Sequence, residues 1–143
     1  MRRICLVALF LALSCGFNVW ADDVEEAKSI RELVQQMMVD EAEGVFQKAI
    51  QEWPGSEALA AVRPILFSAH SRAGQWAQAA EHATANHSRV LKQLRDGKVP
   101  PGQIVQSASM AGSSLLRSDQ LEQSVALYEE ALAVVVGQAQ DTG

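Results

Sequence analysis

Hydrophobic residues recur at spacings of three and four along most of the chain, and this spacing places side chains on one face of an α-helix. Ala42, Phe46 and Ala49 are the clearest example. Proline and glycine at 54–55 then end this segment, because proline cannot continue a helix and glycine takes turn conformations at little cost. No stretch alternates with the period of two that a half-buried β-strand requires. The pattern therefore predicts an all-α protein.

The same pattern divides the chain into six predicted helices, which form three consecutive pairs. They cover residues 24–37, 42–53, 57–73, 75–97, 103–118 and 120–136. Glycine is expected to end the third, fourth and sixth helices, at Gly74, Gly97 and Gly137. One continuous helix from Val24 to Trp53 is the alternative to the first pair, since neither glycine nor proline lies between its two helices.

Polar residues before several helices have the spacing of N-terminal caps. The D-x-x-E sequences at 40–43 and 119–122 predict capping boxes for the second and sixth helices. Ser56 is expected to cap the third helix. Pro64 would disturb the interior of that helix, so it either kinks the helix or marks where an early turn passes into the main helix.

Aromatic residues are expected to anchor the packing between helices. Phe46, Trp76 and Tyr128 lie on apolar faces, and we expect all three to be largely buried. The predicted buried face of the last helix consists of Leu121, Val125, Tyr128, Leu132 and Val135.

The first 21 residues have the order of a secretory signal peptide. Arg2 and Arg3 supply positive charge, residues 4–13 form an apolar run, and the small residue Ala21 precedes the expected cleavage site. The run is shorter than the roughly 20 residues that a membrane-spanning helix needs. We therefore expect a protein exported to the periplasm or outside the cell, without a membrane span after cleavage.

Both cysteines, Cys5 and Cys15, lie within this segment. Lipidation of Cys15 is a less favoured alternative to simple cleavage, because Ala12 and Leu13 match the signal for it poorly. The mature chain then has no thiol for a disulfide, a metal thiolate or a nucleophile. It is also acidic: without Arg2 and Arg3 it carries 17 acidic and 10 basic residues, a net charge of −7. Such a surface repels phosphate backbones, so we expect no nucleic-acid partner.

Small and aromatic residues in these helices resemble the tetratricopeptide repeat (TPR). Its second helix carries alanine, an aromatic residue, alanine and a closing proline, and its first helix carries a leucine–glycine–aromatic group. Matching positions are Ala42, Phe46, Ala49 and Pro54 in the first pair, Leu66, Gly74, Trp76 and Ala79 in the second, and Gly112, Leu121, Ser124, Tyr128 and Ala131 in the third.

The resemblance implies antiparallel helix pairs stacked as a short right-handed α-solenoid of about three repeats. The implied domain covers residues 22–139, with repeats at 23–56, 57–97 and 103–138 and a tail at 140–143. Successive repeats are degenerate, since matched positions lie 37 and 45 residues apart instead of the usual 34. An unrelated helical bundle is the alternative.

Catalytic and metal-binding patterns are sparse. His82 and His87 point about 140° apart on a helix, so they do not chelate one metal, and with His70 we expect surface or half-buried histidines. The serines of residues 107–118 lack a G-x-S-x-G elbow, and no glycine-rich phosphate loop is present. We expect a non-enzymatic protein without metal or cofactor.

If the pairs stack as the resemblance implies, their first helices line a groove that binds extended peptides or partner helices. The candidate groove residues are Arg31, Ser68, Arg72, Ser109, Ser113 and Arg117. Arg72 and Arg117 occupy equivalent positions near the ends of their helices, where two guanidinium groups could hold a peptide carboxylate. The simpler alternative is that each complements the dipole of its own helix.

The expected function is an exported protein–protein interaction module or scaffold for a protein or peptide partner. The alternative is a helical oligomerisation or spacer domain, which could be the N-terminal part of a longer envelope protein. An exposed apolar face on the last helix would favour self-association, and with it this alternative.

Overall fold

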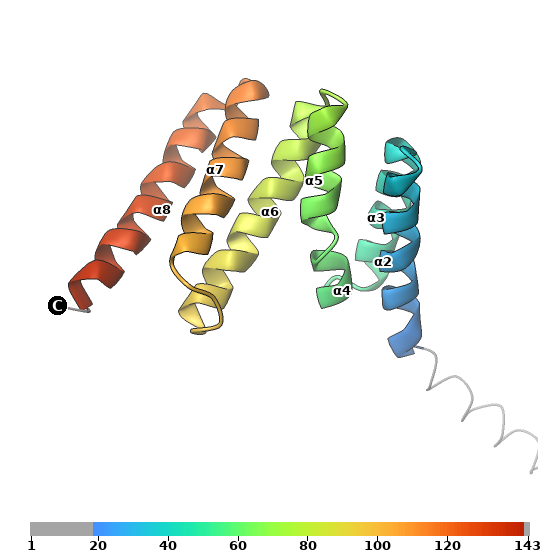
Figure 1. Ribbon diagram of the computed structural model, residues 1–143, viewed down its shortest axis with the longest axis horizontal. Helices are drawn as coiled ribbons and strands as arrows, with labels where there is room; N and C mark the ends of the chain where they lie inside the picture. The colour runs from blue at the N-terminus through green and yellow to red at the C-terminus, as the bar shows by residue number, and fades with distance from the viewer. Residues whose placement is uncertain (1–18, 142–143) are drawn as a thin grey trace, which may run out of the picture. The chain divides into compact units, whose positions relative to one another are not determined.

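The computed structural model describes residues 19–141, and these residues form helices and turns without a β-strand (Figure 1). The helices are α2 (Val19–Gln35), α3 (Val39–Glu52), α4 (Glu57–Ala60), α5 (Arg63–Arg72), α6 (Trp76–Arg95), α7 (Gly102–Arg117) and α8 (Leu121–Asp141). The expected all-α class is confirmed. The predicted signal peptide lies outside the described residues, apart from its last three positions at the start of α2.

The chain divides into two compact units, Met1–Val62 and Arg63–Gly143. The described part of unit 1 contains α2, α3 and α4, and α2 packs against both of the others. Unit 2 contains α5 to α8. Within residues 19–141, no helix is both long and apolar enough to cross a membrane.

The first pair consists of two helices, so the alternative of one continuous helix is wrong. The chain turns at Met37, whose φ of 62° lies in the left-handed region. The Met38 N–H donates to Leu33 O at 2.9 Å, and the Met37 N–H donates to Val34 O at 3.0 Å. These two bonds close a helix end in the way that usually requires glycine. The sequence shows no break here because methionine occupies the glycine position.

Neither predicted capping box forms. α3 begins at Val39, so Asp40 lies inside its first turn instead of capping it. Asp119 has a φ of 60° and closes α7, with the Gln120 N–H donating to Leu115 O at 2.9 Å. A left-handed residue cannot take the extended conformation of an N-cap, so the conformation that ends α7 excludes the predicted role of Asp119 in α8.

Ser56 caps α4 as predicted. Its Oγ accepts from the Leu59 N–H at 3.1 Å and donates to Asp23 Oδ2 at 2.7 Å, so the same hydroxyl also ties the start of α4 to α2. The predicted third helix is divided into α4 and α5, and Pro64 lies in the first turn of α5, where a missing N–H costs nothing. Of the two roles predicted for Pro64, the second is therefore observed.

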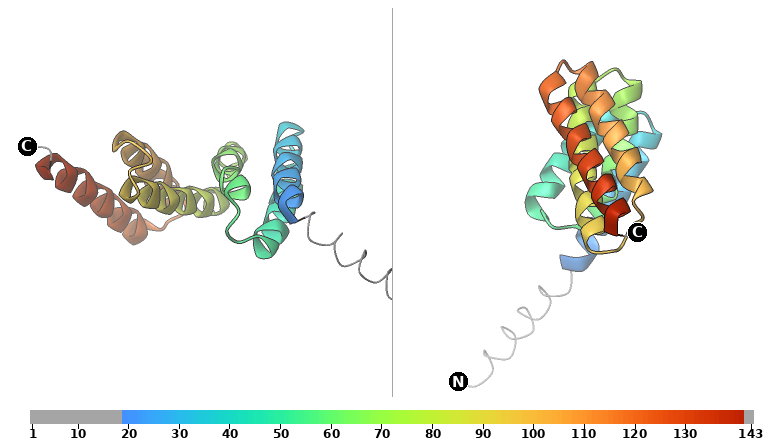
Figure 2. Two further views of the ribbon diagram at one scale, coloured as in Figure 1. Left: turned by 90° about the horizontal axis from the view of Figure 1, so that it is seen from below. Right: turned by 90° about the vertical axis from the view of Figure 1, so that its left-hand side faces the viewer.

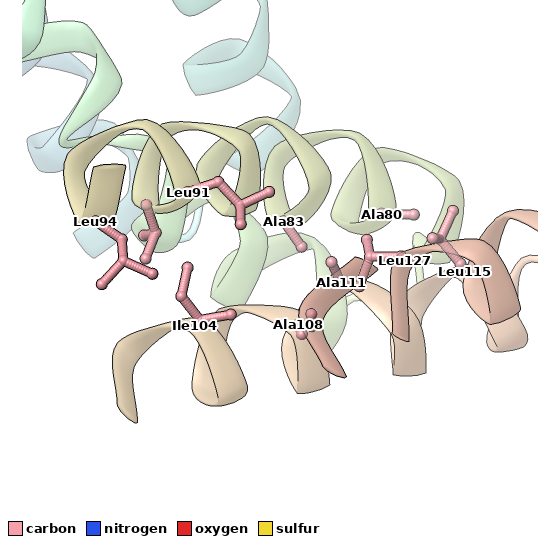
Figure 3. Packing of buried hydrophobic residues seen from close by; sticks show 11 residues of the cluster. Ala80, Ala83, Leu91, Leu94, Ile104, Ala108, Ala111, Leu115 and Leu127 are labelled. Atoms are coloured by element: carbon pink, nitrogen blue, oxygen red, sulfur yellow. The ribbon is translucent and has the colours of Figure 1, made fainter. Parts of the chain in front are cut away.

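Unit 2 is built from consecutive contacts: α5 packs on α6, α6 on α7, and α7 on α8 (Figures 1 and 2). Small and branched side chains of α6 and α7 point toward one another in the core (Figure 3). The buried core cluster consists of Ala80, Ala83, Val90, Leu91, Leu94, Ile104, Ala108, Ala111, Leu115, Leu127 and Ala131. The many alanines let the helix axes come close together.

α7 and α8 approach each other closely at Gly112. A Cβ atom added at Gly112 would collide with the Tyr128 ring, and the buried Ser124 hydroxyl donates to Gly112 O at 2.9 Å. Glycine is therefore required here by space, because the backbone of α7 is itself the surface against which α8 packs.

The predicted buried face of α8 is wrong. Leu121, Val125, Tyr128 and Leu132 are exposed, and Val135 is partly exposed. The buried residues of α8 are Ser124, Leu127 and Ala131, and the partly exposed Tyr128 ring lies beside them over Gly112 of α7. α8 has apolar residues on two faces, and the face with the small residues is the one that fits against Gly112.

Two further expectations for side chains and helix ends are corrected. Among the aromatic anchors, Phe46 is fully buried as predicted, Trp76 is partly exposed, and Tyr128 is 40% exposed because its ring covers Gly112 on one side only.

Gly74 and Gly97 end helices with φ of 74° and 69°, as predicted. Gly137 does not, since α8 continues to Asp141 and takes in half of the predicted tail.

Candidate functional site

The predicted groove residues belong to three helices. Arg31 is a partly buried residue of α2 in unit 1. The other five lie in unit 2: Ser68 and Arg72 on α5, and Ser109, Ser113 and Arg117 on α7. The following geometry concerns these five residues and their neighbours within unit 2.

The serines contribute little to a binding surface. Ser68 Oγ donates to Pro64 O at 2.9 Å, and Ser113 Oγ donates to Met110 O at 3.1 Å, so each hydroxyl proton is used within its own helix. Ser109 is exposed. Ser68 and Ser113 therefore direct no hydroxyl proton toward a ligand.

Arg117 has a defined position. Its guanidinium carbon lies 4.3 Å from the centroid of the partly buried Trp76 ring, which is a cation–π contact between the end of α7 and the start of α6. Stacking engages the flat face of the guanidinium and leaves the N–H groups at its edge able to donate. From the sequence, only a carboxylate or a helix dipole was predicted as the partner of Arg117. The contact with Trp76 was not predicted.

Arg72 is exposed in the last turn of α5. In Figure 1, α5 and α7 both end at the upper edge of unit 2, where Trp76 begins α6. The predicted pair of arginines, Arg72 and Arg117, therefore lies at one edge of unit 2, with Trp76 supporting the second of them.

A separate hollow of about 300 Å³ lies between α5, α6 and α7. Its lining is mostly amide and other polar side chains, with one arginine: Pro64, Asn86, Arg89, Val90, Gln93, Gln103, Gln106, Ser107 and Met110. None of these residues was predicted to line a binding site. Sequence reasoning assigned the groove to first helices alone, whereas α6 contributes Asn86, Arg89 and Gln93 to the lining of this hollow.

All three histidines are buried, which corrects the expectation of surface or half-buried positions. The rings of His70 and His82 stack at 5.6 Å with an interplanar angle of 10°, and His70 Nδ1 lies 2.7 Å from Gln75 Oε1. The stack joins α5 to α6.

His87 and Ser107 form a buried polar contact between α6 and α7. Ser107 Oγ donates to Ile104 O at 3.1 Å and lies 2.8 Å from His87 Nδ1. Burial lowers the pKa of His87, and the negative charge of Glu130 opposes part of that change. The donation of the Ser107 hydroxyl to a backbone carbonyl differs from a serine nucleophile activated by a histidine base, in which the hydroxyl donates to the imidazole.

No known protein family, curated protein or solved structure matches this chain. Function is therefore inferred from its residues and their geometry.

Proposed function

We propose that this chain is a non-catalytic, TPR-like module that binds an extended segment of a protein partner. The observations that carry the proposal are the polar hollow between α5, α6 and α7 and, toward the other end of these three helices, Arg117 held on Trp76. In a TPR-like array these helices would form two adjacent pairs, α5 with α6 and α7 with α8.

The contacts at Gly112 support the TPR resemblance. Gly112, Ser124 and Tyr128 are positions that match the repeat motif in the sequence, and in unit 2 all three meet at one point. This contact is expected in a repeat in which the glycine of the first helix, having no side chain, lets the second helix of the same pair pack closely. Gly74, another matched position, takes the left-handed turn between α5 and α6.

The composition of the hollow supports an extended peptide as the ligand. Asn86, Gln93, Gln103 and Gln106 each carry both a donor and an acceptor, as a peptide backbone does. An extended chain has unpaired N–H and C=O groups along its length, which amide side chains can satisfy. A lining dominated by carboxylates or lysines would instead favour a charged small molecule.

Arg72 and Arg117 support a preference for an acidic residue or a C-terminal carboxylate in that peptide. A guanidinium held by an aromatic ring loses less freedom when it binds, and bidentate bonds to a carboxylate are among the stronger polar contacts. Because the rest of the chain is acidic, a negatively charged group is attracted to this edge more than to other parts of the surface.

The position of Ser107 supports a non-catalytic role. Although this serine lines the hollow beside His87, it is 4% exposed and its proton is committed to Ile104 O. We also propose export through the predicted signal peptide at residues 1–21, which places the binding partner in the periplasm or outside the cell.

Peptide binding measured by fluorescence anisotropy tests the proposal. A library of unstructured peptides with free or amidated C-termini should yield ligands whose affinity falls when Gln93 and Gln106 are changed to alanine. Carboxylate-bearing ligands should also lose affinity in the Arg72→Ala/Arg117→Ala variant, and the loss should shrink as salt increases.

Arg95→Ala is the matched control, since Arg95 is an exposed arginine at the opposite end of α6 from Trp76. It lies two positions from the hollow residue Gln93, and residues two apart on a helix do not share a face. Binding that is equally weakened by Arg95→Ala, or unaffected by all of these changes, would contradict the proposed site.

A further inference from the structure

The exposed side of α8 carries a continuous apolar seam. Its members follow at spacings of four, three, four and four residues and are between 40% and 64% exposed: Leu121, Val125, Tyr128, Leu132 and Val136. This set is called the α8 seam below. The buried face with Ser124, Leu127 and Ala131 is the neighbouring one, and Tyr128 lies at the border, with one side of its ring over Gly112 of α7.

The arrangement of the seam is typical of a helix that pairs with another helix. From Leu121 to Leu132 the steps alternate between four and three, as the core positions of a coiled coil do, and Val136 follows about one turn further along. Ten large hydrophobic residues are exposed in the described part of the chain, and five of them belong to this one seam. Exposed hydrophobic residues that are scattered singly need no explanation, but a line of five along one helix does.

The charges of α8 narrow the choice of partner. The helix contains Glu122, Glu129 and Glu130 but neither lysine nor arginine. Helices that lie on membranes carry basic residues beside their apolar face, so a lipid surface is not favoured. An acidic peptide is also disfavoured, because α8 has no lysine or arginine to pair with its carboxylates. The partner surface must be apolar along its centre and free of strong negative charge there.

A second copy of the same helix satisfies these conditions. The centre of the seam is uncharged, so no like charges meet there when two copies pair, and a two-fold contact requires only that one patch be complementary to itself. The exposed parts of the five side chains amount to an area on the order of 500 Å², the size of a functional surface patch. Two such patches together bury about 1,000 Å², near the lower limit for a specific interface.

We propose that this chain forms a two-fold dimer in which the α8 seam of one copy packs against the α8 seam of a second copy. The small area predicts a reversible dimer with a dissociation constant in the micromolar range. Glu122 and Glu129 lie beside the seam in both copies, so added salt should strengthen the dimer by screening their repulsion. This is the opposite of the salt dependence expected for carboxylate binding at Arg72 and Arg117.

Sedimentation equilibrium of the purified protein, from about 1 to 200 µM, tests the proposal over the range in which small interfaces associate. Wild type should change from monomer to dimer, and Leu132→Glu should raise the dissociation constant about 100-fold, because two charges would be buried in the interface. Leu132 is 64% exposed, so this change should leave the fold of the monomer intact. Leu132→Ser is a milder second variant for the same position.

Val105→Glu is the matched control, since Val105 is an exposed valine on α7 outside the seam. It should dimerise as wild type does. Circular dichroism of each variant verifies that the helices are intact. A wild-type monomer at 200 µM, a dimer unchanged by both Leu132 variants, or a dimer broken equally by Val105→Glu would overturn the proposal. A monomer that captures an amphipathic helix of another protein on this seam would overturn it as well.

Discussion

Met37 is an exposed methionine in a backbone conformation that glycine adopts without strain. Its side chain is 86% exposed and contributes no packing, while its φ of 62° costs roughly 1–2 kcal/mol for an L-residue with a Cβ atom. Met37→Gly should therefore raise the free energy of unfolding by about 0.5–1 kcal/mol, after the larger entropy of glycine in the unfolded chain is taken into account.

Urea denaturation measures this change. Gly74→Ala is the matched control, because Gly74 has a φ of 74° with open space around its Cα, and it should lose about 1 kcal/mol for the same reason. A Met37→Gly protein that is less stable than wild type would mean that the turn between α2 and α3 does not have this geometry in solution.

His87 should make stability depend on pH. Burial lowers its pKa in the folded protein below the ordinary value of 6.5, so the unfolded chain binds a proton more readily than the folded chain does. Stability from this residue is present above pH 6.5 and is lost as the pH falls toward the lower folded pKa.

The measurement is the free energy of unfolding at pH 7.5 and pH 5.5 for wild type and His87→Gln, which keeps a side-chain donor toward Ser107. Wild type should lose more stability than the variant between these two pH values. Other titrating groups affect both proteins alike, so an equal loss in the two would show that His87 does not carry the effect.

At the scale of elements, the contact of α7 with α8 depends on the missing side chain at Gly112. In a Tyr128→Ala background, Gly112→Ala should stabilise the protein by up to about 1 kcal/mol, because alanine is the better helix former. In wild type that gain should be lost, since the new Cβ would displace the Tyr128 ring.

A double-mutant cycle followed by thermal or urea unfolding gives the coupling between these two positions, which we expect to be about 1 kcal/mol. Gly137→Ala is the control, because Gly137 also lies within a helix but has open space around it. Additive effects of Gly112→Ala and Tyr128→Ala would show that the ring does not cover Gly112.

At the scale of the whole molecule, the proposed export fixes where the mature chain should begin. Cleavage after Ala21 leaves Asp22 as the first residue and removes both cysteines, so N-terminal sequencing of protein recovered from the envelope or medium should start at Asp22. A mass that includes acyl chains on Cys15, or retention of Met1, would contradict the prediction. The full-length chain expressed in the cytoplasm serves as the uncleaved reference.

Sequence by itself determined the all-α class and the turns at Gly74 and Gly97, because helical spacing and left-handed glycines are local properties of a chain. It also located Phe46 in the core and placed Gly112, Ser124 and Tyr128 in related positions of a motif. The turn at Met37 could not be predicted from the sequence, because methionine as a residue type does not indicate a left-handed conformation, which here the flanking helices hold in place.

Only the tertiary structure decided which apolar face of α8 is buried. Both faces have helical spacing, and the choice depends on the space that Gly112 leaves for Ser124 and Tyr128. The same holds for the contact of Arg117 with Trp76 and for the floor of the polar hollow, since both join helices that are distant in sequence. Periodicity shows that a helix has an apolar side, but the shape of the neighbouring helix selects the side that packs.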